Sequence, residues 1–245
     1  MLSAVAIVPS PPILVPELTG RSVTEALAVR AATLEAGGML GALANRWIAL
    51  GVHEKARTVP SDSRGSFAAY GVDVKVAFSP ADVTTEIDST IPLAALVAGW
   101  IRDHSAPCAV VDVHLVGLDT SSESCVSIGR ELRKSMDDSA EPWGLLVVAD
   151  GSTMLTAKAP GSFDPRAEEV QTQIDDALAN ADVDALAGLD RQLCAGVGVE
   201  GTAAWQTLAG IVGDGEARPR TLYRGAPFGV GYFVGTWESL SGESL

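Results

Sequence analysis

Near its start the chain reads Leu2-Ser3-Ala4-Val5-Ala6-Ile7-Val8-Pro9-Ser10-Pro11-Pro12. The uncharged run up to Val8 is typical of a buried strand, and Pro9 ends it. The prolines that follow exclude a helix and predict an extended loop at the carboxyl end of this strand. No basic residue precedes the run, and the prolines interrupt it too early for a signal peptide or a membrane span.

Beyond this strand, apolar runs and helical patterns alternate along the chain. Further strands are predicted over residues 47–52, 72–78, 108–115, 143–149, 220–223 and 230–236. Helices are predicted over residues 22–45, 91–103, 123–136, 164–179, 183–190 and 202–212, the fourth with Asp164 as N-cap and Pro165 at its first position. The alternation predicts an α/β fold with a mostly parallel central sheet and helices on both faces. No linker divides the chain, so we expect a single domain over residues 1–245.

Composition and charge narrow the class of protein. The chain has 245 residues, of which 47% are apolar, enough for one large core. Its formal net charge of −14 disfavours nucleic acid and anionic membranes as partners. Cys108, Cys125 and Cys194 are far apart and form no disulfide framework or zinc ribbon. Reduced thiols and the absence of a predicted membrane span lead us to expect a cytoplasmic protein.

Several polar side chains follow the predicted strands directly. Ser10 follows the first strand, His53 the second, and Asp150-Gly151-Ser152-Thr153 the strand over residues 143–149, while His114 lies near the end of the strand over 108–115. Ligands of open α/β sheets bind beyond the carboxyl ends of the strands. We therefore expect a cleft between Ser10, His53 and Thr153.

Three stretches of the sequence carry a resemblance to a known family. They are Ile7-Val8-Pro9-Ser10-Pro11-Pro12-Ile13-Leu14-Val15-Pro16-Glu17, Ala149-Asp150-Gly151-Ser152 with Lys158-Ala159-Pro160-Gly161-Ser162-Phe163-Asp164-Pro165-Arg166, and Gly225-Ala226-Pro227-Phe228-Gly229-Val230-Gly231-Tyr232. In this order they resemble the catalytic-subunit (LigB-like) family of class III extradiol dioxygenases and the related Memo-like proteins. The stretches extend from the first strand to the last, so the resemblance implies that fold for the whole chain.

The resemblance also implies a chemistry, which can be compared with this chain residue by residue. In the family a ferrous ion is held by two histidines and a carboxylate, and a further histidine serves as acid and base during ring opening. Ser10 stands at the position of the first histidine ligand, and His53 matches the second. Glu200, followed by Gly201 and Trp205, is similar to the carboxylate ligand, whereas Thr153 replaces the acid–base histidine.

These replacements predict a degenerate metal site. We expect a protein that binds a small molecule or a partner without conventional Fe(II) ring cleavage, and the resemblance also implies a homodimer. The cofactor is either absent or a weakly held divalent metal, Fe²⁺ or Zn²⁺. The candidate pocket residues are Ser10, Asp150, Ser152 and Thr153, and the candidate metal ligands are His53, Glu200 and His114. The alternative is a metal-dependent, ring-cleaving dioxygenase-like oxidoreductase with a rewired site around His53 and Glu200.

Other interpretations stay open at this point. An interaction protein without a small-molecule ligand is a third possibility, and it predicts a cleft plugged by side chains. Lys158 and Arg166 either attract an anionic ligand or form a salt bridge that pins their loop. The turn at Asp150-Gly151-Ser152 either walls a pocket or only caps its own backbone. His104 is expected to be exposed at a helix end.

Overall fold

The computed structural model describes residues 1–19, 24–80 and 86–239 and contains a seven-stranded main sheet. Its strands are β1 (Leu2–Val8), β2 (Arg46–His53), β3 (Arg57–Val59), β6 (Val110–Gly117), β7 (Trp143–Val148), β8 (Ala217–Gly225) and β9 (Tyr232–Ser239). Their order across the sheet is β3-β6-β2-β7-β1-β9-β8. The α/β class predicted from the sequence is confirmed.

The sheet is mixed, so the prediction of a mostly parallel sheet holds for four adjacent strands and not for the edges of the sheet. The four adjacent strands β6, β2, β7 and β1 are parallel to one another. Strands β9 and β8 run antiparallel because residues 226–231 join them as a short hairpin connection. Strand β3 follows β2 after only three residues, so the chain reverses and β3 pairs antiparallel with β6.

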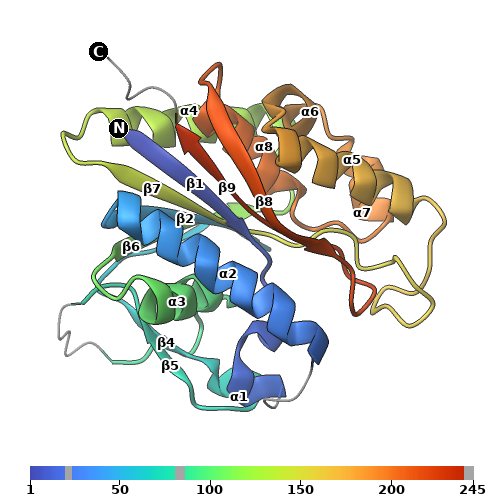
Figure 1. The fold of residues 1–245 in the computed structure, drawn as a ribbon, viewed down its shortest axis with the longest axis horizontal. Coiled ribbons are helices and arrows are strands. Elements are labelled where there is room, and N and C mark those ends of the chain that lie inside the picture. The colour runs from blue at the N-terminus through green and yellow to red at the C-terminus, as the bar shows by residue number, and fades with distance from the viewer. Residues whose placement is uncertain (20–23, 81–85, 240–245) are drawn as a thin grey trace.

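Helices cover both faces of the sheet, as Figure 1 shows. One face carries α2 (Thr24–Leu43) and α3 (Leu93–Ser105). The other carries α4 (Ser122–Asp137), α5 (Ala167–Asn180), α6 (Val183–Ala187), α7 (Arg191–Gly196) and α8 (Thr202–Val212). Short elements η1 (Pro12–Leu14) and α1 (Pro16–Thr19) follow β1. The inner strands are therefore buried on both sides, which explains why they read as continuous apolar runs.

The strand side chains divide between two apolar clusters, one on each face. In β1, Ala4, Ala6 and Val8 pack beneath α2 and α3, while Val5 and Ile7 pack beneath the five helices of the opposite face. This period of two follows from the pleat of a strand. All of α8 is buried, because it lies between the sheet and helices α4 and α6.

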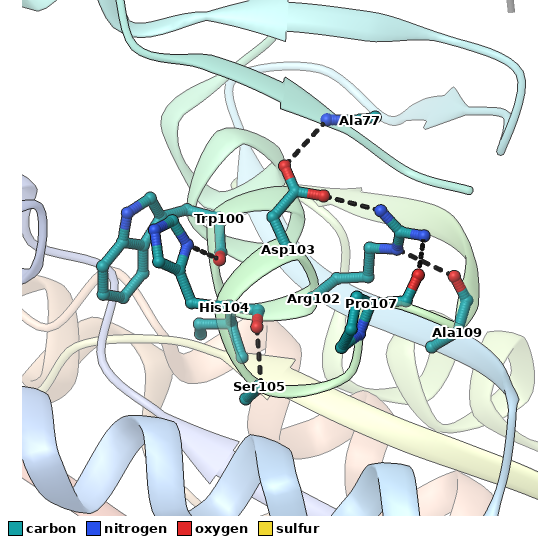
Figure 2. A network of polar contacts seen from close by, with 9 residues as sticks. Ala77, Trp100, Arg102, Asp103, His104, Ser105, Pro107 and Ala109 are labelled. Atoms are coloured by element: carbon teal, nitrogen blue, oxygen red, sulfur yellow. Dashed lines mark hydrogen bonds and ion pairs between the residues drawn. The ribbon is translucent and has the colours of Figure 1, made fainter. Parts of the chain in front are cut away.

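A polar network fixes the end of α3 (Figure 2). The buried Arg102 donates from Nε to the Ala109 carbonyl (2.9 Å), from Nη2 to the Pro107 carbonyl and from Nη1 to Asp103 (2.6 Å). Asp103 in turn accepts from the Ala77 amide (3.2 Å). His104 is exposed, as expected, and its Nδ1 lies 2.8 Å from the Trp100 carbonyl. The network joins α3 to the approach of β6, and its contacts indicate a structural role.

Several local predictions differ from the structure. The strand expected over 72–78 is only β5 (Lys75–Ala77), which pairs with β4 (Arg64–Ser66) outside the main sheet, and η2 (Phe67–Tyr70) lies between them. Helix α5 begins at Ala167 and not at Asp164, because the Asp164 side chain and carbonyl close a turn onto the amides of Arg166 and Ala167. Helix α7 was not predicted, although Asp190 caps it. The expected start of the first helix, Ser22, lies outside the described residues.

Helix α2 is long and apolar enough to span a membrane by length and composition, unlike the prediction of no such segment. In the structure α2 packs on β1 and β9, and Val29, Ala36 and Leu40 are buried there, as in a core helix of a globular domain. The three cysteines are free, and Cys108 is exposed in the turn before β6. The cytoplasmic location and the homodimer stay predictions.

Helices α4 and α8 cross at two glycines. A Cβ added at Gly129 would lie 2.3 Å from the Thr207 carbonyl oxygen, and one at Gly210 would lie 2.2 Å from the Val126 carbonyl oxygen. Both neighbours are backbone atoms, which cannot rotate away. The absence of side chains at these two positions therefore sets the distance between the helices.

We expect Gly129→Ala to lower the free energy of unfolding by about 1–3 kcal/mol, because the overpacking outweighs the gain of about 1 kcal/mol in helix propensity. Gly38→Ala in α2 is the matched control. Its added Cβ would have no neighbour closer than 4.0 Å, so it should stabilise the protein by roughly 0.5–1 kcal/mol. Urea unfolding measures both. Equal effects of the two variants would contradict this account of the helix contact.

Candidate functional site

A cleft opens where β1, β2 and β7 end. Its inner hollow, of about 100 Å³, is lined by residues at or just beyond the ends of these strands, among them Ser10, Val52 and Asp150. An outer hollow of about 340 Å³ shares Ser10 and Val52 with it and adds His53. Glu200, on the loop before α8, lines both hollows. The cleft lies where the strand-end rule for α/β sheets places a ligand.

Ser10 and Asp150 are joined by two hydrogen bonds. The Ser10 amide donates to Asp150 Oδ1 (2.9 Å), and the Ser10 hydroxyl donates to Oδ2 of the same carboxylate. The pair therefore connects the end of β1 to the end of β7. Arg30 of α2 supports the loop after Ser10, because its guanidinium donates to the carbonyls of Ile13 (2.9 Å) and Leu14 (2.6 Å).

The Asp150 carboxyl has an unusual acidity. Its pKa is raised from the usual value near 3.8 to about 6, chiefly because the group is buried; the two hydrogen bonds from Ser10 oppose this rise, and the negative charge of Glu200 contributes to it. The side chain keeps some exposed surface, which faces the cleft. A group with this pKa exchanges a proton close to neutral pH, which makes Asp150 the best proton acceptor among the residues that line the inner hollow.

The predicted pocket residues Thr153 and Ser152 lie differently. Thr153 lines the inner hollow, and its hydroxyl donates to the Gly198 carbonyl (3.2 Å). Ser152 is fully buried and does not line it, so its prediction as a pocket residue is corrected. Its hydroxyl donates to the Val197 carbonyl (2.6 Å) and accepts from the Met154 amide (3.1 Å). Ser152 thus fixes the turn from beneath, while Thr153 faces the cleft.

Of the predicted metal ligands, the structure brings two to the cleft and leaves one outside. His53 and Glu200 both line the outer hollow. His114 lies in the interior of β6, where it pairs with Leu50 and not with the strand end, which is Gly117 beside His53. The side chains of its neighbours Val113 and Leu115 point to the α2–α3 face. Because side chains alternate along a strand, the His114 side chain points to the opposite face. The predicted strand over 108–115 is shifted by two residues from β6, and this shift placed His114 wrongly near a strand end.

The residues in the cleft do not fit the three-ligand ferrous centre that the resemblance implies. Within residues 1–19, 24–80 and 86–239, no group of three or more His, Cys, Asp or Glu side chains could hold a metal ion. The Ser10 hydroxyl, at the position that the resemblance assigns to the first ligand histidine, donates to a carboxylate. A neutral hydroxyl in that role is a poor ligand for Fe(II).

Sequence reasoning missed Gln171 of α5, which supports the turn after β7. Its Oε1 accepts from the Ser152 amide (2.8 Å), and its Nε2 donates to Asp175 (2.8 Å), which accepts in turn from Arg224 Nε (2.8 Å). Each of these three hydrogen bonds joins polar atoms that are partly or fully buried. Gln171 and Asp175 are spaced four apart on the inner face of an amphipathic helix, and that pair of polar residues is the signal that could have revealed them.

Lys158 and Arg166, the two basic residues of the loop between β7 and α5, do not line either hollow. Arg166 pairs with Asp164 (2.7 Å), and the arginine holds the pKa of that carboxyl at about 2. This favours the salt-bridge interpretation for Arg166. Lys158 is exposed and does not line either hollow.

Comparisons with known proteins place the fold and no more. No family model matches the chain, and no curated protein matches it. Among solved structures it is similar to the crystal structure of uncharacterized protein JW3007 from Escherichia coli K12, with a TM-score of 0.54 and 11% sequence identity. The match covers 96% of this chain and 99% of that one. At this identity the likeness supports a shared α/β architecture along the chain.

The raised pKa of Asp150 predicts that the contribution of this carboxyl to the unfolding free energy falls as pH rises. Between pH 4 and 6 the folded chain holds a proton on Asp150 that the unfolded chain has lost, so ionising Asp150 destabilises the fold as pH rises. The unfolding free energy of the wild type relative to Asp150→Asn should fall by roughly 1–3 kcal/mol from pH 4 to pH 7. Urea unfolding at several pH values measures it.

Asp164→Asn is the control for this experiment. The pKa of Asp164 is lowered, so its contribution must stay constant or increase over the same pH range, opposite in sign to Asp150. A wild-type stability that rises with pH relative to Asp150→Asn would show that the Asp150 carboxyl is not held in its neutral form by burial.

Proposed function

We propose that this protein is a divergent relative of the LigB-like class III extradiol dioxygenases and Memo-like proteins. In this proposal it has a degenerate metal site and binds a small molecule in the strand-end cleft without conventional Fe(II) ring cleavage. The α/β fold with an open cleft beyond the parallel strands supports a binding function. The open cleft also disfavours the alternative of a pure interaction protein.

The arrangement of the three family-like stretches supports the relationship. The first stretch meets the second through the bonds from Ser10 to Asp150. The second meets the third, because the Gly151 amide donates to the Gly231 carbonyl (2.8 Å) and the Gly231 amide donates to the Ser152 carbonyl (2.9 Å). Segments that were singled out by sequence alone thus adjoin one another at the end of the sheet.

One observation carries the proposed loss of ring cleavage, namely the hydroxyl bond from Ser10 to Asp150. The side chain that stands in place of a ligand histidine is committed to a carboxylate on the neighbouring strand end. The same bond engages Asp150, the nearest carboxylate that could serve as a substitute ligand. A second imidazole is also missing, because Thr153 occupies the position of the acid–base histidine.

The proposal is tested with the full chain, purified anaerobically, loaded with Fe(II) and then given catechol and dioxygen. We expect iron to be removed by gel filtration and no ring-opened product to absorb in the visible range, because fewer than three ligands hold iron poorly against water. An extradiol dioxygenase treated identically verifies the assay. Stoichiometric iron together with ring-opened product would refute the proposal.

A second candidate function is a metal-dependent, dioxygenase-like oxidoreductase with a rewired site. The observation that favours it is that His53 and Glu200 line one hollow. If both bind a metal, His53→Ala and Glu200→Gln should each weaken Zn²⁺ or Fe²⁺ binding by about tenfold or more, measured by calorimetric titration. His104→Ala, at the exposed end of α3, is the control and should leave the affinity unchanged. Unchanged affinities in all three variants would exclude this candidate.

A further inference from the structure

We infer that the ligand of the cleft is a small organic cation, a protonated amine on a short apolar body, held at the carboxylates of Glu200 and Asp150. The inference rests on the proposed binding function and adds the chemical class of the ligand. Three observations carry it: the charged side chains that line the two hollows are acidic, the nearby arginines bind other groups, and the rest of the wall is apolar.

The charged side chains that line the two hollows are predominantly acidic. Asp150 and Glu200 line the inner hollow, and Glu54 joins Glu200 in the outer one. Among the described residues, no lysine or arginine lines either hollow. His53 is the lone lining side chain there that could carry a positive charge. An anionic ligand would lose part of its hydration and meet charges of its own sign, which is unfavourable.

The nearby arginines are engaged elsewhere. Arg191 lies beside Glu200 on an adjoining hollow, but its guanidinium donates to the Leu118 carbonyl (2.5 Å) and to Gln206 Oε1 (3.1 Å). Arg166 pairs with Asp164. The carboxylate of Glu200 thus faces the cleft, and none of these arginines forms an ion pair with it.

Repulsion between Glu200 and Asp150 would be relieved by a cation. Glu200 is one of the causes that keep the pKa of Asp150 high, although burial is the larger one. A positive charge between the two carboxylates favours the ionised form of Asp150, so binding of the cation and loss of the Asp150 proton are linked. The Ser10 hydroxyl bond holds the Asp150 carboxylate in place for this contact.

The rest of the wall is apolar. Val52 and Ala94 line both hollows, and Leu93, Pro92 and Leu118 line the outer one. Aliphatic surface of this kind favours an apolar body attached to the charged group. A bare metal ion fits less well, because it needs more ligand atoms than the described residues bring together. The hollows of about 100 and 340 Å³ limit the ligand to a small molecule.

Three probes of one shape and different charge test the inference: benzylamine, benzyl alcohol and benzoate. Binding to the full chain at pH 7.5 is measured by ligand-observed NMR titration. We expect benzylamine to bind at least about tenfold more tightly than the alcohol, and benzoate not to bind. Glu200→Gln should weaken benzylamine about tenfold and leave benzyl alcohol unchanged, and Glu54→Gln should act in the same direction.

Glu131→Gln, which removes an exposed carboxylate of α4, is the matched control and should bind benzylamine as the wild type does. Thermal unfolding verifies that each variant is folded. Binding of benzoate or benzyl alcohol as tightly as benzylamine, binding of no probe, or an equal loss in Glu131→Gln would each overturn the inference. None of these results bears on ring cleavage, so the proposed function is judged separately by the iron and catechol assay.

Discussion

The bonds between Ser10 and the Asp150 carboxylate are the contact on which the cleft depends. They join the loops after β1 and β7, two neighbouring strands whose chain positions are 140 residues apart. Two polar groups are satisfied at once where a buried carboxylate would otherwise lack partners. The same contact limits what the cleft can do, because it commits the Ser10 hydroxyl to a carboxylate and holds that carboxylate at the edge of the hollow.

Support for this contact comes from residues that do not touch the cleft. Gln171 fixes the turn after Asp150 from below, and Arg30 fixes the loop after Ser10 from the side of α2. Both are buried polar side chains that bind backbone groups of loops. Loops at the end of an α/β sheet lack partners of their own, so such side chains give them one conformation. The site is therefore set by helices on both faces of the sheet.

Much of this architecture could be predicted from the sequence, and the limits have physical causes. The apolar run 2–8 and the helix over 202–212 have the predicted bounds, because burial on all sides leaves an unmistakable pattern. Strands β3 and β4 were missed, since three-residue edge strands with Arg57 and Arg64 carry no such pattern. The pattern of apolar residues predicts where strands lie but not their direction, so the antiparallel strands of the mixed sheet were not predicted. At the site, Ser10 and Thr153 line the inner hollow, whereas a two-residue error in β6 misplaced His114.

The position of β1 in the sheet has a consequence for how the chain folds. Its two neighbours are β7, residues 143–148, and β9, residues 232–239, so β1 is synthesised well before either of the strands with which it pairs. Until β9 is synthesised, one edge of this apolar strand stays open to pairing with other chains. Such distant pairing slows folding, and β1 of a nascent chain therefore depends on the much later strand β9 to cover its open edge.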